Sequence, residues 1–233
     1  MALRGTAHQA NTSTSTTCVV NVAGIGIQSG DIVLLCISGG GGGTNTFTFP
    51  SGFASITSPT SLPNLNLNSG STAAIAIKTA GASEPSSYTI TSNKTDFQTA
   101  VCRVYSGRSG TITDDISTAP LNITCPHAVP ATGVTAAASD DVVVFYPTNG
   151  YEGSGTPAYT TPTGFANSDL ASNLVTFSPI MFSADDVGVS SGATGTISTT
   201  MSDGAGKLYT VGCYVLSLAA GGSTNSAVIA WTI

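Results

Sequence analysis

A chain of 233 residues with six basic and twelve acidic side chains, and a net charge of −6, lacks the basic cluster that phosphate binding needs. Because nucleic acids and anionic membrane surfaces are both bound through Lys and Arg, we expect neither as a partner. Charged residues are only 8% of the chain against a usual fraction of about 25%, so Ser and Thr supply the polar surface, which predicts an all-β fold.

The first 17 residues are polar, and Thr12 to Thr17 contains only Ser and Thr. Such low-complexity segments rarely pack, so we expect residues 1–17 to form an N-terminal arm. The opening residues carry one Arg and no apolar run, from which we expect no signal peptide. The folded body is therefore expected to begin at Cys18.

From residue 18 onward, one pattern occurs twice at an offset of about 110 residues, a period too long for a solenoid. The first copy is an acidic residue and an apolar run, Asp31 to Ile37, followed by the turn Pro50 to Phe53. The second copy is Asp141 to Tyr146, followed by Pro162 to Phe165. The repeat predicts two similar halves, either two small β-domains or one sandwich built by duplication.

We place these halves at residues 18–118 and 119–218, in an antiparallel, jelly-roll-like β-sandwich that forms one unit. The uninterrupted apolar runs 32–37 and 142–146 are typical of central strands covered on both faces. Alternation places Cys102 and its repeat partner Cys213 on the core side of their strands. Residues 106–130 are expected to link the halves through one or two short strands.

The five cysteines are widely spaced and form no Cys-x-x-Cys motif, so we expect buried reduced thiols rather than disulfides or a zinc site. One catalytic motif matches, because residues 188–192 read Gly-x-Ser-x-Gly. That motif needs a helix after it and a later His, whereas His8 and His127 both precede it, so we reject it. The Asp pairs lack the spacing of a calcium loop. We therefore expect no enzyme activity, no metal and no cofactor.

Two segments are candidates for interaction with a partner. A polar loop over residues 57–72 carries an alternating leucine set, and a loop of that length is often functional. Residues 219–233 form a hinge of small residues followed by an apolar C-terminal strand. A free strand of this kind would expose several large apolar side chains, so we expect it to pair with its own sheet, a neighbouring copy or a capsid shell. The candidate residues are Leu62, Leu65, Leu67, Val228, Ile229, Trp231 and Ile233.

The doubled pattern resembles a β-sandwich module of tailed-bacteriophage virion proteins, in which an aromatic residue follows Pro-x-Gly. In that module a Gly-Ala-Glu-Pro-x-x-Tyr-like segment precedes an alternating strand, and residues 81–88 fit it, whereas residues 191–195 replace it in the second copy. The resemblance covers residues 18–218 and carries over no catalytic residue. It implies a structural protein of the virion, assembled in the host cytoplasm, and leaves open its location in the head or the tail.

Among such proteins, a capsid decoration or cement protein is the first hypothesis, with the major capsid protein or other virion proteins as partners. We expect a homo-oligomer, either a trimer or a dimer. The alternative is a glycan-binding or host-adhesion module of a fibre or surface protein. In that case the exposed aromatic residues would be Tyr151, Tyr159 and Tyr209.

Overall fold

The computed structural model describes residues 3–40, 45–56, 71–150, 157–172, 179–204 and 206–221, and the backbone of residues 65–66. All of the regular elements in these ranges are β-strands, which confirms the all-β prediction. The strands pair antiparallel throughout and pack as sheets against one another, as in a β-sandwich. Val, Ile, Thr and aromatic residues dominate the longest strands, because these side chains suit a pleated surface.

The first half of the chain builds one five-stranded inner sheet in the order β1-β8-β3-β7-β5. A smaller outer layer forms where β2 and β4 pair with the first part of β8, so that β8 spans both layers. A short strand, β6, adds to β7. The bounds are β1 (Leu3–Ala10), β2 (Ser15–Asn21), β3 (Ile32–Gly40), β4 (Phe47–Thr48), β5 (Ala54–Ser55), β6 (Leu65–Asn66), β7 (Thr72–Thr79) and β8 (Ser87–Tyr105).

The second half builds an inner sheet in the order β14-β15-β12-β18-β9 and an outer sheet in the order β10-β17-β13. A two-stranded ladder of β11 and β16 lies beside the outer sheet. The bounds are β9 (Arg108–Thr124), β10 (His127–Ala131), β11 (Thr135–Ala136), β12 (Asp141–Gly150), β13 (Ala158–Tyr159), β14 (Ala166–Ala171), β15 (Pro179–Val187), β16 (Gly192–Ala193), β17 (Ile197–Ser202) and β18 (Leu208–Ala220).

The two inner sheets have matching pairing orders. Read from opposite ends, β1 matches β9, β8 matches β18, β3 matches β12, β7 matches β15, and β5 matches β14. In the strand at the matching end of each sheet, Cys102 pairs with Ala7 of β1 and Cys213 pairs with Thr118 of β9. This match supports two similar halves, while their origin by duplication and the jelly-roll connectivity stay predictions.

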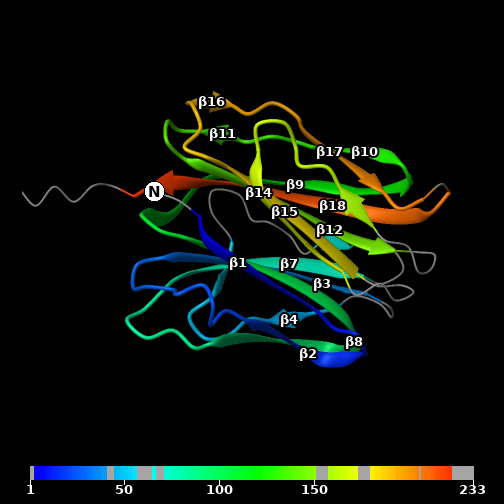
Figure 1. Cartoon of the computed structure of the whole chain (residues 1–233), viewed down its shortest axis with the longest axis horizontal. Coiled ribbons are helices and arrows are strands. Elements are labelled where there is room, and N and C mark those ends of the chain that lie inside the picture. Colours follow the sequence, from blue (N-terminus) through cyan, green and yellow to red (C-terminus); the bar gives the residue numbers. More distant parts are fainter. Residues whose placement is uncertain are drawn as a thin grey trace, which may run out of the picture.

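Three apolar cores separate four layers of sheet, which lie one above another in Figure 1. A middle core joins the two inner sheets, with Leu34 and Val101 on one side and Phe145 and Leu216 on the other. Two outer cores each join an inner sheet to its own outer layer. Both faces of β3 and β12 are therefore covered, which confirms the interpretation of the apolar runs 32–37 and 142–146.

The side-chain alternation of the last strand in each half is also confirmed. Cys102 lies in the outer core of the first half, and Cys213 lies in the outer core of the second half. Tyr105, on the opposite face of β8, packs in the middle core. All five cysteines are buried and free, so each occupies a core position, as predicted.

The prediction of an N-terminal arm over residues 1–17 is wrong for most of that segment. Leu3–Ala10 form β1, which pairs antiparallel with residues 99–105 of β8, and β2 already begins at Ser15. Leu3 packs against the middle core and Ala7 against the first outer core. A polar strand of this kind is stable because β8 supplies its backbone hydrogen bonds, and composition does not reveal such pairing.

The predicted boundary between the halves is wrong as well. Residues 108–124 form one long strand, β9, rather than a link with one or two short strands, and β9 pairs with β18 of the second half. The chain crosses from the first inner sheet to the second at residues 106–107, where Gly107 has a positive φ of 67°. The segment 108–118 therefore belongs to the second half, not to the first.

The acidic residue of the repeat is Asp140 rather than Asp141. The Asp31 carboxylate accepts a hydrogen bond from the backbone N–H of Gln28 at 2.8 Å, and that of Asp140 accepts one from Ala137 at 3.1 Å. Each Asp stabilises the turn that precedes a central strand, which explains its presence without a metal. Asp141 lies one position later and forms a buried ion pair with Arg108.

Candidate functional site

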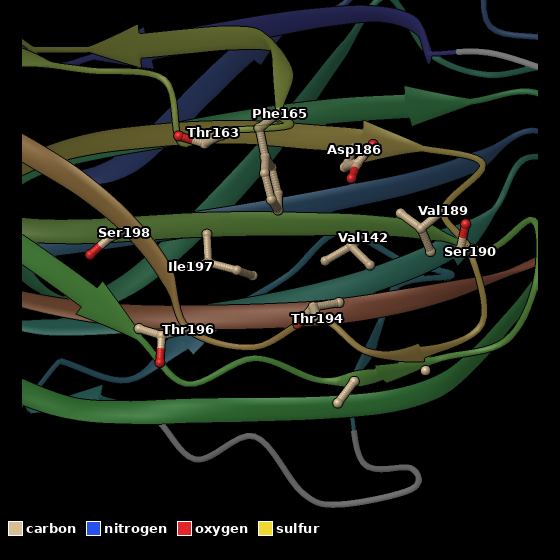
Figure 2. Close-up of a pocket in the computed structure, with 12 residues that line it drawn as sticks. Val142, Thr163, Phe165, Asp186, Val189, Ser190, Thr194, Thr196, Ile197 and Ser198 are labelled. Carbon is tan, nitrogen blue, oxygen red and sulfur yellow. The ribbon is translucent and has the colours of Figure 1, made fainter.

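A cavity of about 270 Å³ opens in the second half of the molecule, beside the β11–β16 ladder (Figure 2). Val142 of β12 and Ile197 of β17 are the buried apolar residues of its lining. Figure 2 shows the Phe165 side chain projecting inward from the segment that precedes β14. The polar side chains of the lining are those of Thr163, Asp186, Ser190, Thr194, Thr196 and Ser198. Val189, Gly192 and Ala193 complete it.

The position of Phe165 follows from the Pro-x-Gly-Phe turn that the sequence shows twice. The backbone N–H of Phe165 donates to the carbonyl of Pro162 at 3.0 Å, and that of Phe53 donates to Pro50 at 3.2 Å. The glycine before each aromatic residue has a φ of +87°, a conformation that side chains with a Cβ rarely adopt. The turn thereby directs each aromatic ring onto an outer core, since Phe53 packs against the first and Phe165 against the second.

Asp186 is the only titratable residue of the cavity lining. It lies on β15 opposite Val142, half-buried, and its carboxylate lies close to Gly164. Burial, and then the negative charge of Asp185, raise the pKa of Asp186 above the ordinary aspartate value. Within the described ranges no side chain donates a hydrogen bond to this carboxylate or forms an ion pair with it. Its charge therefore faces the cavity without a counter-charge from the part of the chain that the structure describes.

The corresponding place in the first half is filled by side chains. Lys78 corresponds to Asp186, because Lys78 pairs with Val33 of β3 as Asp186 pairs with Val142 of β12. The Tyr88 ring packs edge-on against Phe53 with centroids 5.0 Å apart. Lys78 Nζ lies 5.8 Å from the Phe53 centroid.

The Lys78 ammonium group also has an acidic partner within the first half. Its Nζ lies 2.8 Å from Glu84 Oε2, and the Tyr88 hydroxyl donates to the same oxygen at 2.7 Å. The Glu84 carboxylate is additionally held by the backbone N–H of Gly81. An aromatic ring and a matched ion pair thus occupy the site in the first half, whereas the second half has an open cavity and an unmatched carboxylate.

A second group of polar residues lies between the inner sheets. Arg103 of β8 is fully buried, and its Nη2 lies 3.0 Å from Asp185 Oδ2 of β15. The guanidinium group also donates to the hydroxyls of Tyr105 and Ser183 at 2.8 and 2.9 Å and to the carbonyl of Asn167 at 3.0 Å. Because a buried guanidinium group is reached by no ligand, we assign this network to the packing of the two halves.

Most of the residues that the sequence proposed for interaction lie outside the described part of the chain. This holds for Val228, Ile229, Trp231 and Ile233 of the C-terminal segment, and for Leu62 and Leu67 of the loop. Leu65 is described only by its backbone, which pairs with Ala73 in the ladder of β6 and β7. These predictions therefore stay untested.

Two of the tyrosines expected to bind a glycan, Tyr159 and Tyr209, are not exposed. Tyr209 is 4% exposed and donates to Asp203, while the Tyr159 ring stacks on Phe182 with centroids 4.9 Å apart. Both rings pack in or against the second outer core. Tyr151 lies outside the described ranges. The prediction is wrong for Tyr159 and Tyr209, because both rings are used to fill the second outer core.

The Gly-x-Ser-x-Gly segment does not have the structure of a nucleophile elbow. Ser190 lines the cavity, but its segment connects β15 to the two-residue strand β16 rather than to a helix. Over the described residues, no three His, Cys, Asp or Glu side chains gather closely enough to hold a metal ion. The same part of the chain contains no helix with the length and hydropathy needed to cross a membrane.

Sequence reasoning predicted the turn that carries Phe165 but missed the cavity beside it. The sequence feature that could have indicated the cavity is a difference between the two copies of the repeat, not a motif. Gly81 to Tyr88 of the first copy contains Glu84 and an aromatic residue, and Ser191 to Gly195 of the second contains neither. Comparison with models of protein families, with curated proteins and with solved structures finds no match.

Proposed function

We propose that this chain is a non-enzymatic structural protein of a tailed-bacteriophage virion that decorates or cements the capsid. Its partners are the major capsid protein or other virion proteins, and it acts as a dimer or trimer assembled in the host cytoplasm. The duplicated module that residues 18–218 resemble supports this assignment. The observation that carries it is the middle core, because a stack of four sheet layers joined by three apolar cores suits a rigid structural component.

Binding to purified particles tests this proposal. Fluorescently labelled protein is added to phage particles, and its co-sedimentation is measured together with mass spectrometry of untreated particles. Saturable binding at symmetric capsid sites, and detection of the chain in untreated particles, are the expected results. Absence from the particles and failure to bind them would contradict the proposal.

Deletion of residues 222–233 tests the predicted role of the C-terminal segment in this attachment. If that segment joins subunits or attaches to the shell, the shortened protein stays folded but becomes monomeric or no longer binds particles. Circular dichroism and light scattering measure both properties. Unfolding of the shortened protein would show that the segment belongs to its own core.

The second candidate is a glycan-binding or host-adhesion module. One observation favours it: the cavity combines the Phe165 ring with several Ser and Thr hydroxyls, and sugar rings are bound by groups of both kinds. A glycan array tests it, with binding abolished by Phe165→Ala as the expected result. A protein that binds no glycan on the array would exclude this candidate.

A further inference from the structure

We propose that the cavity beside Asp186 binds one basic side chain, an arginine or a lysine, of a partner protein. This inference rests on the proposed function in one respect, which is that the partner is taken to be another virion protein. It concerns a site that the resemblance to phage modules does not assign. Its basis is the unequal filling of two corresponding places in the molecule.

The charge of the cavity selects a cation. Asp186 is half-buried and has no donor or counter-charge among the described side chains, although desolvation of a carboxylate is costly without one. The matching place in the first half contains both charges, because Lys78 and Glu84 lie 2.8 Å apart there. Among its described residues, the second half therefore lacks one member of an ion pair, and that member is positive.

The shape of the cavity selects a cation on an apolar stem. Apolar side chains, among them Val142, Ile197 and Phe165, line part of the cavity, and the stems of Lys and Arg pack well on such surfaces. In the first half, the Lys78 ammonium group lies 5.8 Å from the ring of Phe53, the counterpart of Phe165. A guanidinium or ammonium group beside Asp186 would have the same relation to Phe165, a favourable cation–π contact.

The volume of the cavity limits the occupant to one such group. About 270 Å³ holds a single long side chain but not a folded element. Ser190 and Thr194 contribute hydroxyl oxygens at the lining, which can accept further N–H donors of a guanidinium group. A neutral sugar would also fit these hydroxyls but would leave the Asp186 charge unmatched, so the observations favour the basic side chain.

The direct test is an NMR titration of the ¹⁵N-labelled full-length protein with N-acetyl-arginine methylamide and N-acetyl-lysine methylamide. The expected result is saturable shifts of the Val142, Val189 and Thr194 amides, with a dissociation constant on the order of millimolar for one side chain. The citrulline analogue, which has nearly the shape of arginine but no charge, should bind at least about fivefold more weakly. Equal shifts with the citrulline analogue would overturn the proposal.

Two matched variants locate the site. Asp186→Asn should weaken binding of both cationic probes at least about fivefold, whereas Glu84→Gln alters the filled place in the first half and should leave binding unchanged. Well-dispersed amide spectra of both variants exclude unfolding as the cause. Undiminished binding to Asp186→Asn, or stronger binding of glucose or galactose than of the arginine probe, would contradict the proposal.

Particle binding separates this inference from the proposed function. If the native protein binds particles and Asp186→Lys does not, both hold. If native protein and Asp186→Lys bind equally well, the protein is a virion component but its attachment does not use the cavity, and the inference fails. If the native protein binds no particle, the proposed function fails, while the NMR titration still decides whether the cavity binds a basic side chain.

Discussion

Arg103 has no exposed surface, yet its guanidinium group lies at the boundary between the two inner sheets. A buried charge is tolerated only when an opposite charge and hydrogen bonds replace its water shell. Asp185 supplies the charge, and Tyr105, Ser183 and Asn167 supply the oxygen acceptors. All five residues lie within strands β8, β14 and β15.

We predict that Arg103→Ala lowers the free energy of unfolding by about 3–5 kcal/mol, because it leaves the Asp185 carboxylate buried and unpaired. The double variant Arg103→Met, Asp185→Leu should lose less than the single one, since it removes both charges and keeps the volume filled. Urea unfolding measures both values. Arg4→Ala, which disrupts the partly exposed pair of Arg4 with Asp31, is the control and should cost less. A double variant no more stable than the single one would contradict this account.

His8 and Asp169 join the two halves near the surface, with His8 Nδ1 2.8 Å from the Asp169 carboxylate. The hydrogen bond with Asp169 raises the pKa of His8 above its ordinary value of 6.5. The folded state therefore favours protonated His8. The resulting stability is fully present below pH 6.5 and is lost as the pH rises through the higher pKa of the folded state.

We predict that His8→Gln lowers the melting temperature at pH 5.5 and has little effect at pH 9. Because the His8 side chain is 49% exposed, the effect at low pH corresponds to no more than about 1 kcal/mol. Thermal melts of both proteins across this pH range measure the difference. A difference that is the same at pH 5.5 and pH 9 would show that protonation of His8 plays no part.

The thiols are predicted to be inert in the folded protein. Burial raises the pKa of Cys18 and of Cys102 to about 12, so neither is a thiolate near neutral pH. Titration with Ellman's reagent at pH 8 should detect no thiol before urea is added and all five afterwards. The melting temperature should not change when a reducing agent is present. Rapid reaction of a thiol in the folded protein would contradict the prediction.

At the scale of single elements, β1 is an edge strand of the first inner sheet and pairs with β8. Without Leu3–Ala10, the backbone groups of β8 that pair with β1 would form an open sheet edge. We predict that deletion of residues 1–11 lowers the urea midpoint, because each lost backbone hydrogen bond contributes about 1 kcal/mol. Hydrogen exchange at residues 99–105 should accelerate. An unchanged midpoint would mean that this segment is dispensable, as an arm would be.

The sequence predicted some elements better than others, for physical reasons. The runs at 32–37 and 142–146 are apolar on both faces, so their pattern alone indicates central strands. Residues 3–10 and 108–118 are polar or mixed, and their strand structure depends on partners about 100 residues away in the chain. Local composition contains no information about such pairing, and this explains both wrong boundaries.

The whole molecule has a shared core that neither half can complete alone. An isolated half would expose the apolar face of its inner sheet, including Leu34 and Val101 in the first half or Phe145 and Leu216 in the second. Exposed apolar faces of this extent favour aggregation. The middle core therefore makes folding of the two halves interdependent, although each has an outer core of its own.

We predict that residues 1–106 or 107–233, expressed separately, aggregate or unfold without a cooperative transition. Co-expression of the two fragments should give a soluble complex, because the break falls at the crossing between the sheets and keeps both pairing orders intact. Size-exclusion chromatography and thermal melts measure these outcomes. A break at residues 118–119 is the control and should give less complex, since it divides β9. A monomeric fragment that melts cooperatively would contradict the prediction.

The candidate site shows a further limit of sequence reasoning. The turn at Pro162 to Phe165 was predicted, because its proline and glycine determine local backbone angles. The cavity was not, since it results from what the second half lacks relative to the first. Asp186 follows Asp185 directly in the sequence, and its position opposite Val142 appears only when strand register is known.

The position of Arg103 opposite Asp185 also affects which inner sheets can associate when several copies of the chain fold together. Two identical first halves meeting through their inner sheets would bury two guanidinium groups together, and two second halves would bury two carboxylates. Either encounter places like charges in an apolar interface, which is strongly unfavourable. The correct union of unlike halves is the one that neutralises the charge. The ion pair therefore favours association of a first half with a second half over association of two identical halves.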